Sequence, residues 1–149
     1  MAINLTFNRI VLIKEKSARY NLPRVIASPQ DVLDAVRVVM QLEEEAQEVF
    51  GAIYLNVKNH IIGMQELSRG SLNASIVSTR DVFKAALLHN AGGIVLFHNH
   101  PSGNPAPSQE DKLVTERLKE AGKLMEMEII DHVIVGDGSY YSFKEEKIL

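Results

Sequence analysis

The segment that most constrains this chain is HNHPSGNPAPSQED, residues 98–111, which follows a short apolar run at residues 94–97. The run contains no polar residue, so it predicts a strand that is buried on both faces in the centre of a sheet. His98 and His100 continue this strand, and because side chains alternate along a strand, both imidazoles face the same side. Pro101 then ends the pairing of the strand. Any fold of this chain must therefore place two histidines at the end of a central strand.

The rest of the pattern predicts an α/β (α+β) fold, with a mixed sheet flanked by helices. Ser28, Ser78 and Ser108 each precede a segment with helically spaced apolar residues, as N-cap residues do. Further strands are expected at residues 10–13, 50–56, 61–67, 128–135 and 140–143, with another extended piece at residues 71–77. Glu43, Glu44 and Glu45 are expected to form the solvated end of the first helix. We divide the chain into an N-terminal arm, residues 1–27, and one domain, residues 28–149.

The side chains of His98, His100 and Asp111 predict a catalytic zinc site. Asp111 comes three residues after the N-cap Ser108, in a first helical turn where a carboxylate is favoured by the helix dipole. Two imidazoles and one carboxylate, with a fourth position left for water, are typical of catalytic zinc. The chain has no cysteine, which excludes a thiolate site. Zinc lowers the pKa of bound water from about 15.7 to about 7, so a carboxylate is still needed to accept the proton. Local spacing does not identify that carboxylate.

The same residues carry a family resemblance. Residues 98–111 fit the H-x-H-P-x6-S-x2-D signature of the JAMM (MPN+) metalloproteases at every fixed position. The stretch from about residue 47 to 143 resembles the RadC-like JAB-domain family, with matching runs that include EVFGAIYLN, IVLFHNHPSG and IIDHVIVGDGSYYSF. The resemblance implies a cytidine deaminase-like (JAB/MPN) fold in which His98, His100 and Asp111 bind zinc. It also implies that Ser108 stabilises an oxyanion and that Glu48 is the general acid/base.

These features together predict a zinc-dependent hydrolase that acts on a peptide or isopeptide bond of a protein or peptide substrate. Two alternatives stay open: a DNA-repair or mobile-element accessory protein that binds nucleic acid, and a zinc-bearing interaction module without turnover. The net charge of −3 argues against binding to a DNA backbone. Residues 1–46 show no counterpart of the N-terminal helix-hairpin-helix segment of long RadC-like proteins. No insertion resembles the ubiquitin-gripping segments of eukaryotic deubiquitinases, which leaves the substrate open.

Several of these residues also have plainer interpretations. Ser108 is a helix N-cap whether or not it takes part in chemistry, and Glu45 is the alternative to Glu48 as the base. Asp131 and His132 are expected to be a structural pair within a strand, although a role in orienting a metal ligand stays open. His60 and His89, at a turn and a helix end, are expected on the surface.

The expected location is the cytoplasm. The absence of cysteine fits a reducing compartment. The N-terminus lacks the pattern of a signal peptide, and no segment has the roughly 20 apolar residues that span a bilayer.

Overall fold

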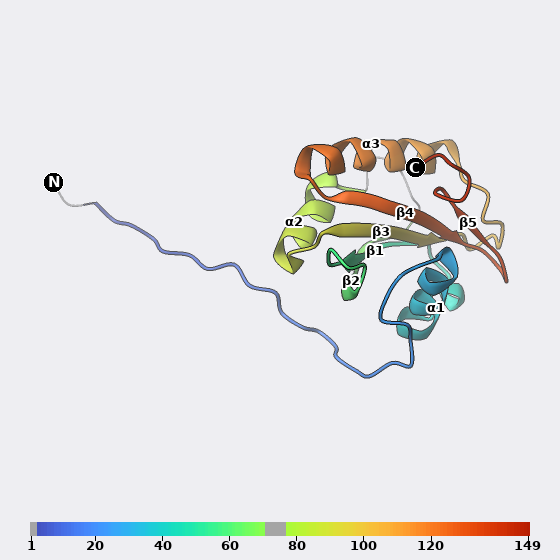
Figure 1. Ribbon diagram of the computed structural model, residues 1–149, viewed down its shortest axis with the longest axis horizontal. Helices are drawn as coiled ribbons and strands as arrows, with labels where there is room; N and C mark the ends of the chain where they lie inside the picture. Colours follow the sequence, from blue (N-terminus) through green and yellow to red (C-terminus); the bar gives the residue numbers. More distant parts are fainter. Residues whose placement is uncertain (1–2, 71–76) are drawn as a thin grey trace.

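A computed structural model of the chain describes residues 3–70 and 77–149. Its centre is a five-stranded sheet with the order β2-β1-β3-β4-β5 (Figure 1). The strands are β1 (Val49–Leu55), β2 (Ile61–Arg69), β3 (Gly93–Asn99), β4 (Glu128–Val135) and β5 (Tyr140–Ser142). Strands β3 and β4 are parallel and the other neighbours are antiparallel, so the sheet is mixed, as the sequence predicts.

In the described part of the chain, three α-helices cover the sheet: α1 (Pro29–Met40), α2 (Thr79–His89) and α3 (Gln109–Met125). Each begins after its predicted serine N-cap, whose side-chain oxygen accepts from the backbone N–H three residues later. The first helix is shorter than predicted. It ends at Met40 because Gln41 takes a left-handed conformation, and a separate 3-10 helix, Leu42–Glu44, carries most of the acidic run.

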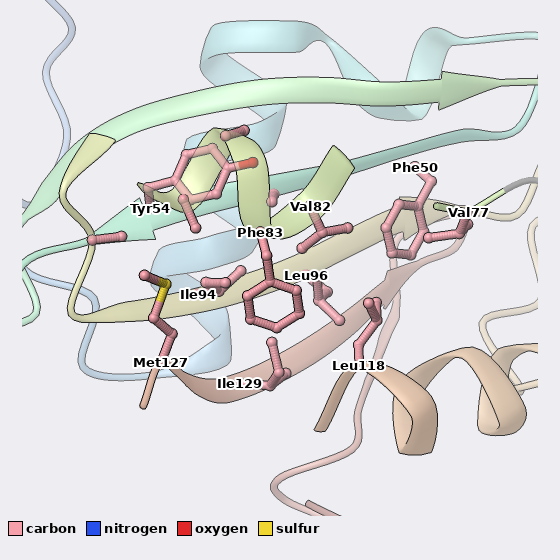
Figure 2. Packing of buried hydrophobic residues seen from close by; sticks show 14 of the residues in the cluster. Phe50, Tyr54, Val77, Val82, Phe83, Ile94, Leu96, Leu118, Met127 and Ile129 are labelled. Carbon is pink, nitrogen blue, oxygen red and sulfur yellow. The ribbon is translucent and has the colours of Figure 1, made fainter. Parts of the chain in front are cut away.

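Helix α1 lies on one face of the sheet, while α2 and α3 lie on the other (Figure 1). Strands β1 and β3 are buried at every residue, since alternate side chains enter the two layers. On the α2 and α3 side, Phe50, Tyr54 and Leu96 pack with apolar side chains of both helices (Figure 2). The layer beneath α1 contains Val95 and Phe97. Because β3 is covered on both faces, its alternating side chains are fixed in direction, and so are those of the residues at its end.

The arm before α1 differs from the sequence prediction. Residues 10–13 form no strand, and the arm runs extended away from the sheet (Figure 1). Near its end the arm meets the rest of the protein, where Val25 pairs with His60 and Leu22 packs against the core. The predicted extended piece at residues 71–77 lies, apart from Val77, outside the described residues. Within residues 3–70 and 77–149, no helix has both the length and the apolar content needed to cross a membrane.

Candidate metal centre

The end of β3 brings two imidazoles together. His98 is fully buried and His100 is partly exposed, and their Nε2 atoms lie 3.0 Å apart. Both rings lie on the sheet face that is covered by α3, as strand alternation predicts. The other nitrogen of the His100 ring, Nδ1, lies 2.8 Å from the backbone oxygen of Asn104 in the following loop, and this contact fixes the orientation of the ring.

Asp111 reaches the two rings from the first turn of α3. One of its oxygens, Oδ2, accepts from the backbone N–H of Ser108 at 2.7 Å and from the Ser108 hydroxyl at 2.8 Å. The other, Oδ1, lies 3.2 Å from Nε2 of His98. Oδ1 is buried and has no hydrogen-bond partner among the described residues. A buried carboxylate oxygen without a partner beside two imidazole nitrogens fits the donor set of a divalent cation.

Glu48 completes the group from the neighbouring strand. It immediately precedes β1, which pairs antiparallel with β3 so that Phe50 is opposite His98. Its Oε1 atom lies 3.7 Å from Nε2 of His100 and 3.9 Å from Nε2 of His98. The ligand atoms of Glu48, His98, His100 and Asp111, which we call the ligand cluster, all lie within 4.8 Å of one another. Glu45, the alternative base, instead forms an ion pair with Arg69.

The charges in the ligand cluster depend on burial and on mutual contacts. Burial lowers the pKa of His98, although Asp111 opposes this effect. Contact with Asp111 raises the pKa of His100. Burial alone would raise the pKa of Asp111, but the adjacent rings of His100 and His98 hold it well below its usual range. The cluster therefore contains an ionised carboxylate beside two imidazoles, and a bound cation would take the place of the proton that the raised pKa of His100 favours.

Ser108 lies at the wall of a pocket beside the ligand cluster. Its hydroxyl caps α3 by accepting from the backbone N–H of Asp111 at 3.1 Å, and it donates its own proton to Asp111. The pocket has a volume of ≈ 340 Å³. Its lining residues are Glu48, His100, Pro101, Ser102, Ser108 and Glu110. The serine is therefore both the helix cap and a side chain at the mouth of the site.

Asp131 and His132 lie together in β4, where the Asp131 carboxylate accepts from the backbone N–H of His132 at 2.7 Å, but their side chains do not face each other. The Asp131 carboxylate accepts from the Ser142 hydroxyl at 2.7 Å and from the backbone N–H of Lys144 at 3.0 Å. Burial raises the pKa of Asp131. The His132 ring points to the other side, where its Nε2 lies 2.8 Å from Nδ1 of His98, and burial lowers the pKa of His132 well below its ordinary value. Asp131 thus holds the segment of Ser142 and Lys144, while His132 contacts the candidate ligand His98 on the side away from the metal site.

Three residues support the site through contacts that the sequence analysis did not predict. Asn99 bonds to the segment around Glu48, Thr115 contacts His132, and Gly136 touches the loop after β3. Thr115 lies on the buried face of α3, four residues after Asp111, which is the only sequence signal that could have identified it. The surface prediction for His89 is wrong, because its half-buried ring stacks on Tyr54 with ring centroids 4.6 Å apart.

Comparison with known proteins agrees with the sequence resemblance and extends it. The family model of the RadC-like JAB domain matches residues 26–148, beyond both ends of the stretch at residues 47–143. A UPF0758 protein of Methanosarcina acetivorans is 49% identical over 123 residues, which are 83% of this chain and 53% of that protein. A UPF0758 protein of Shouchella clausii is 50% identical over 121 residues, 81% of this chain and 52% of that protein. The chain spans about half the length of these curated relatives.

Proposed function

The chain belongs to the RadC-like JAB domain family, and on this premise we propose that it is a zinc-dependent hydrolase of peptide or isopeptide bonds. The observation that carries the proposal is the ligand cluster, whose donor atoms lie within 4.8 Å of one another. It stands beside a pocket that is open to a substrate. The substrate we propose is a protein or peptide. We also propose a cytoplasmic location, which the absence of cysteine supports.

His98, His100 and Asp111 would hold the metal. Two imidazoles and one carboxylate suit zinc better than calcium or magnesium, which prefer oxygen ligands. The buried Oδ1 of Asp111, without a hydrogen-bond partner among the described residues, supports this assignment. When bound, the ion would lower the pKa of a coordinated water and polarise the substrate carbonyl.

Glu48 would move the proton in the hydrolysis. The oxygen of a water molecule adds to the carbonyl carbon, and the Glu48 carboxylate takes one proton from that water. The same proton passes to the amide nitrogen as the carbon–nitrogen bond breaks, so Glu48 ends in its starting state. Its position is favourable because Oε1 lies within 4 Å of both candidate histidine ligands.

Ser108 would donate a hydrogen bond to the oxyanion that forms on the carbonyl oxygen. Its proton is directed at Asp111 in the present geometry. Rotation about the Cβ–Oγ bond would redirect this proton toward the adjoining pocket, which Ser108 lines. The cap of α3 would then lose the bond to Asp111 for the duration of the reaction.

The proposal is tested by metal content and turnover in matched variants. Protein purified without added zinc should contain close to one equivalent, and Asp111→Ala should lose it. Glu48→Gln should retain zinc but lose hydrolysis of a fluorogenic peptide library and of lysine-ε-linked isopeptides. An active Glu48→Gln variant would refute the role of Glu48, and protein without metal would refute the metal site.

The same preparations separate the alternatives. Zinc retention without turnover of any peptide or isopeptide probe would favour the non-catalytic interaction module. A salt-dependent shift of duplex DNA at physiological ionic strength would favour the nucleic-acid-binding protein. We expect no such shift, since the chain carries a net charge of −3.

A further inference from the structure

A buried chain of hydrogen bonds runs behind His98. Nδ1 of His98 lies 2.8 Å from Nε2 of His132, and Nδ1 of His132 lies 2.6 Å from Oγ1 of Thr115. Oγ1 of Thr115 in turn lies 2.6 Å from the backbone oxygen of Asp111. His98 and His132 are fully buried and Thr115 is 2% exposed. This series of hydrogen bonds starts on β3, crosses to β4 and passes through α3 to Asp111, whose side chain is the carboxylate of the ligand cluster.

The proton positions along this chain follow from its last member. A backbone carbonyl only accepts, so the Thr115 hydroxyl must donate its single proton to the oxygen of Asp111. Oγ1 of Thr115 can then only accept from the ring of His132, which places a proton on Nδ1 of His132. A neutral imidazole has one N–H, so Nε2 of His132 must accept from Nδ1–H of His98. A neutral His98 ring, which is the form that binds a metal, then carries its lone pair on Nε2, and this atom faces the other members of the ligand cluster.

The packing around His132 favours the neutral ring on which this reasoning depends. The ring stacks on Phe143 with centroids 5.0 Å apart and meets Phe50 edge-on at 5.6 Å. Its two nitrogens are occupied by His98 and Thr115. In the described part of the chain, no carboxylate oxygen forms a hydrogen bond to the ring that could balance a positive charge. A buried charge without such a partner is strongly disfavoured.

We propose that Thr115 and His132 are positioning residues that fix His98 as the Nδ1-protonated tautomer, with its Nε2 lone pair directed at the metal site. The inference rests on the metal site proposed above. It differs from the way His100 is held, because Nδ1 of His100 meets the backbone oxygen of Asn104 directly. His98 reaches a backbone oxygen only through two side chains, so a single substitution can reverse its tautomer.

Thr115→Val provides the test, and Thr115→Ser is its matched control. Valine has the shape of threonine but cannot accept from the Nδ1–H of His132. The His132 ring is then free to carry its proton on Nε2 and to donate to Nδ1 of His98, which moves the His98 proton onto Nε2. Serine keeps the hydroxyl and therefore keeps the original arrangement.

Histidine tautomers are read directly from long-range ¹H–¹⁵N spectra of metal-free, ¹⁵N-labelled protein, with signals assigned through single His→Gln variants. We expect Nδ1–H on both His98 and His132 in the wild type and in Thr115→Ser, and exchange to Nε2–H in Thr115→Val. Zinc affinity, measured by competition with a chelating dye, should fall about 10- to 100-fold in Thr115→Val and recover in Thr115→Ser.

Two results would overturn the proposal: a wild-type His98 protonated on Nε2, or a Thr115→Val variant with wild-type zinc affinity. If Thr115→Val does not fold, the wild-type spectrum alone decides. A protein with the expected tautomers that takes up no zinc would refute the proposed function but support the tautomer assignment. The two failures are therefore distinguishable.

Discussion

The side-chain oxygen of Asn99 accepts a hydrogen bond of 2.7 Å from the backbone N–H of Val49. The amide nitrogen of the same side chain donates to the backbone oxygens of Glu45 and Gln47 at 3.2 and 3.1 Å. Asn99 lies between the two candidate histidine ligands but points to the opposite face of β3. It thereby fastens the segment that carries Glu48 to the strand that carries the histidines.

Substitution of Asn99 by Asp should disturb this fastening. The carboxylate keeps the acceptor for Val49 but replaces both N–H donors with an oxygen that faces two backbone carbonyls. We expect the free energy of unfolding, measured in urea, to fall by about 1–3 kcal/mol. Hydrolysis should fall further than zinc affinity, because the displaced residue is Glu48. Asn8→Asp on the exposed arm is the control for the change in charge, and equal stability of the two variants would contradict the assignment.

Gly136 is expected to set the position of the loop after β3. A Cβ atom at this position would lie 2.4 Å from the backbone oxygen of Gly103 and 2.8 Å from Cδ of Pro105. The same loop supplies the Asn104 oxygen that holds the His100 ring. Gly136→Ala should therefore push the loop outward and lower zinc affinity about tenfold, as loss of a supporting contact typically does.

The control for Gly136→Ala is Gly138→Asn in the same turn. Gly138 has a φ of +64°, which asparagine tolerates, and a Cβ there meets nothing within 4 Å. This variant should retain wild-type zinc affinity. Wild-type zinc affinity in Gly136→Ala as well would show that the loop adapts without moving His100.

The elements that sequence predicted well are those fixed by local chemistry. Each helix starts after a serine that caps it, and the apolar run at residues 94–97 is the centre of β3. Strand alternation alone places His98 and His100 on one side and Asn99 on the other. The same local reasoning fails for residues 10–13, because an apolar run becomes a strand only where a partner strand is available.

The contacts that sequence could not predict join residues far apart along the chain. Glu48 lies 50 residues before His98, and only the family resemblance drew attention to it. The register of β1 against β3 brings it to the histidines. His132 is 34 residues from His98 and 17 from Thr115. No local periodicity encodes such pairs, since they depend on the strand order and on the placement of α3 over β4.

His89 should contribute to loss of stability in mild acid. Its ring stacks on Tyr54, and burial lowers the pKa of His89 below the value of about 6.5 expected in the unfolded chain. As the pH falls through the unfolded value, the unfolded chain takes up a proton first, and the folded state loses stability relative to it. Above that value both states are neutral and His89 contributes nothing to the pH dependence.

The measurement compares His89→Gln with the wild type by urea unfolding between about pH 7.5 and pH 5.5, the range in which histidine titrates. Comparing each protein with itself across this range removes the pH-independent cost of losing the stacked ring. The variant should lose less stability than the wild type. It should still lose some, because burial lowers the pKa of His98 and His132 too. An equal loss in both proteins would show that His89 is not the group responsible.

Zinc should stabilise the fold only while the ligand cluster is intact. A ligand that binds the folded state alone, at about 100 times its dissociation constant, adds about 2.7 kcal/mol to the free energy of unfolding. We therefore expect zinc to raise the melting temperature of the wild type and a chelator to reverse the rise. Asp111→Ala also removes the carboxylate that accepts from Ser108 at the start of α3, so its metal-free stability falls for a separate reason. The informative quantity is the difference between zinc-loaded and metal-free protein, which should be large in Glu48→Gln and absent in Asp111→Ala. A zinc-dependent rise that survives in Asp111→Ala would place the ion elsewhere on the molecule.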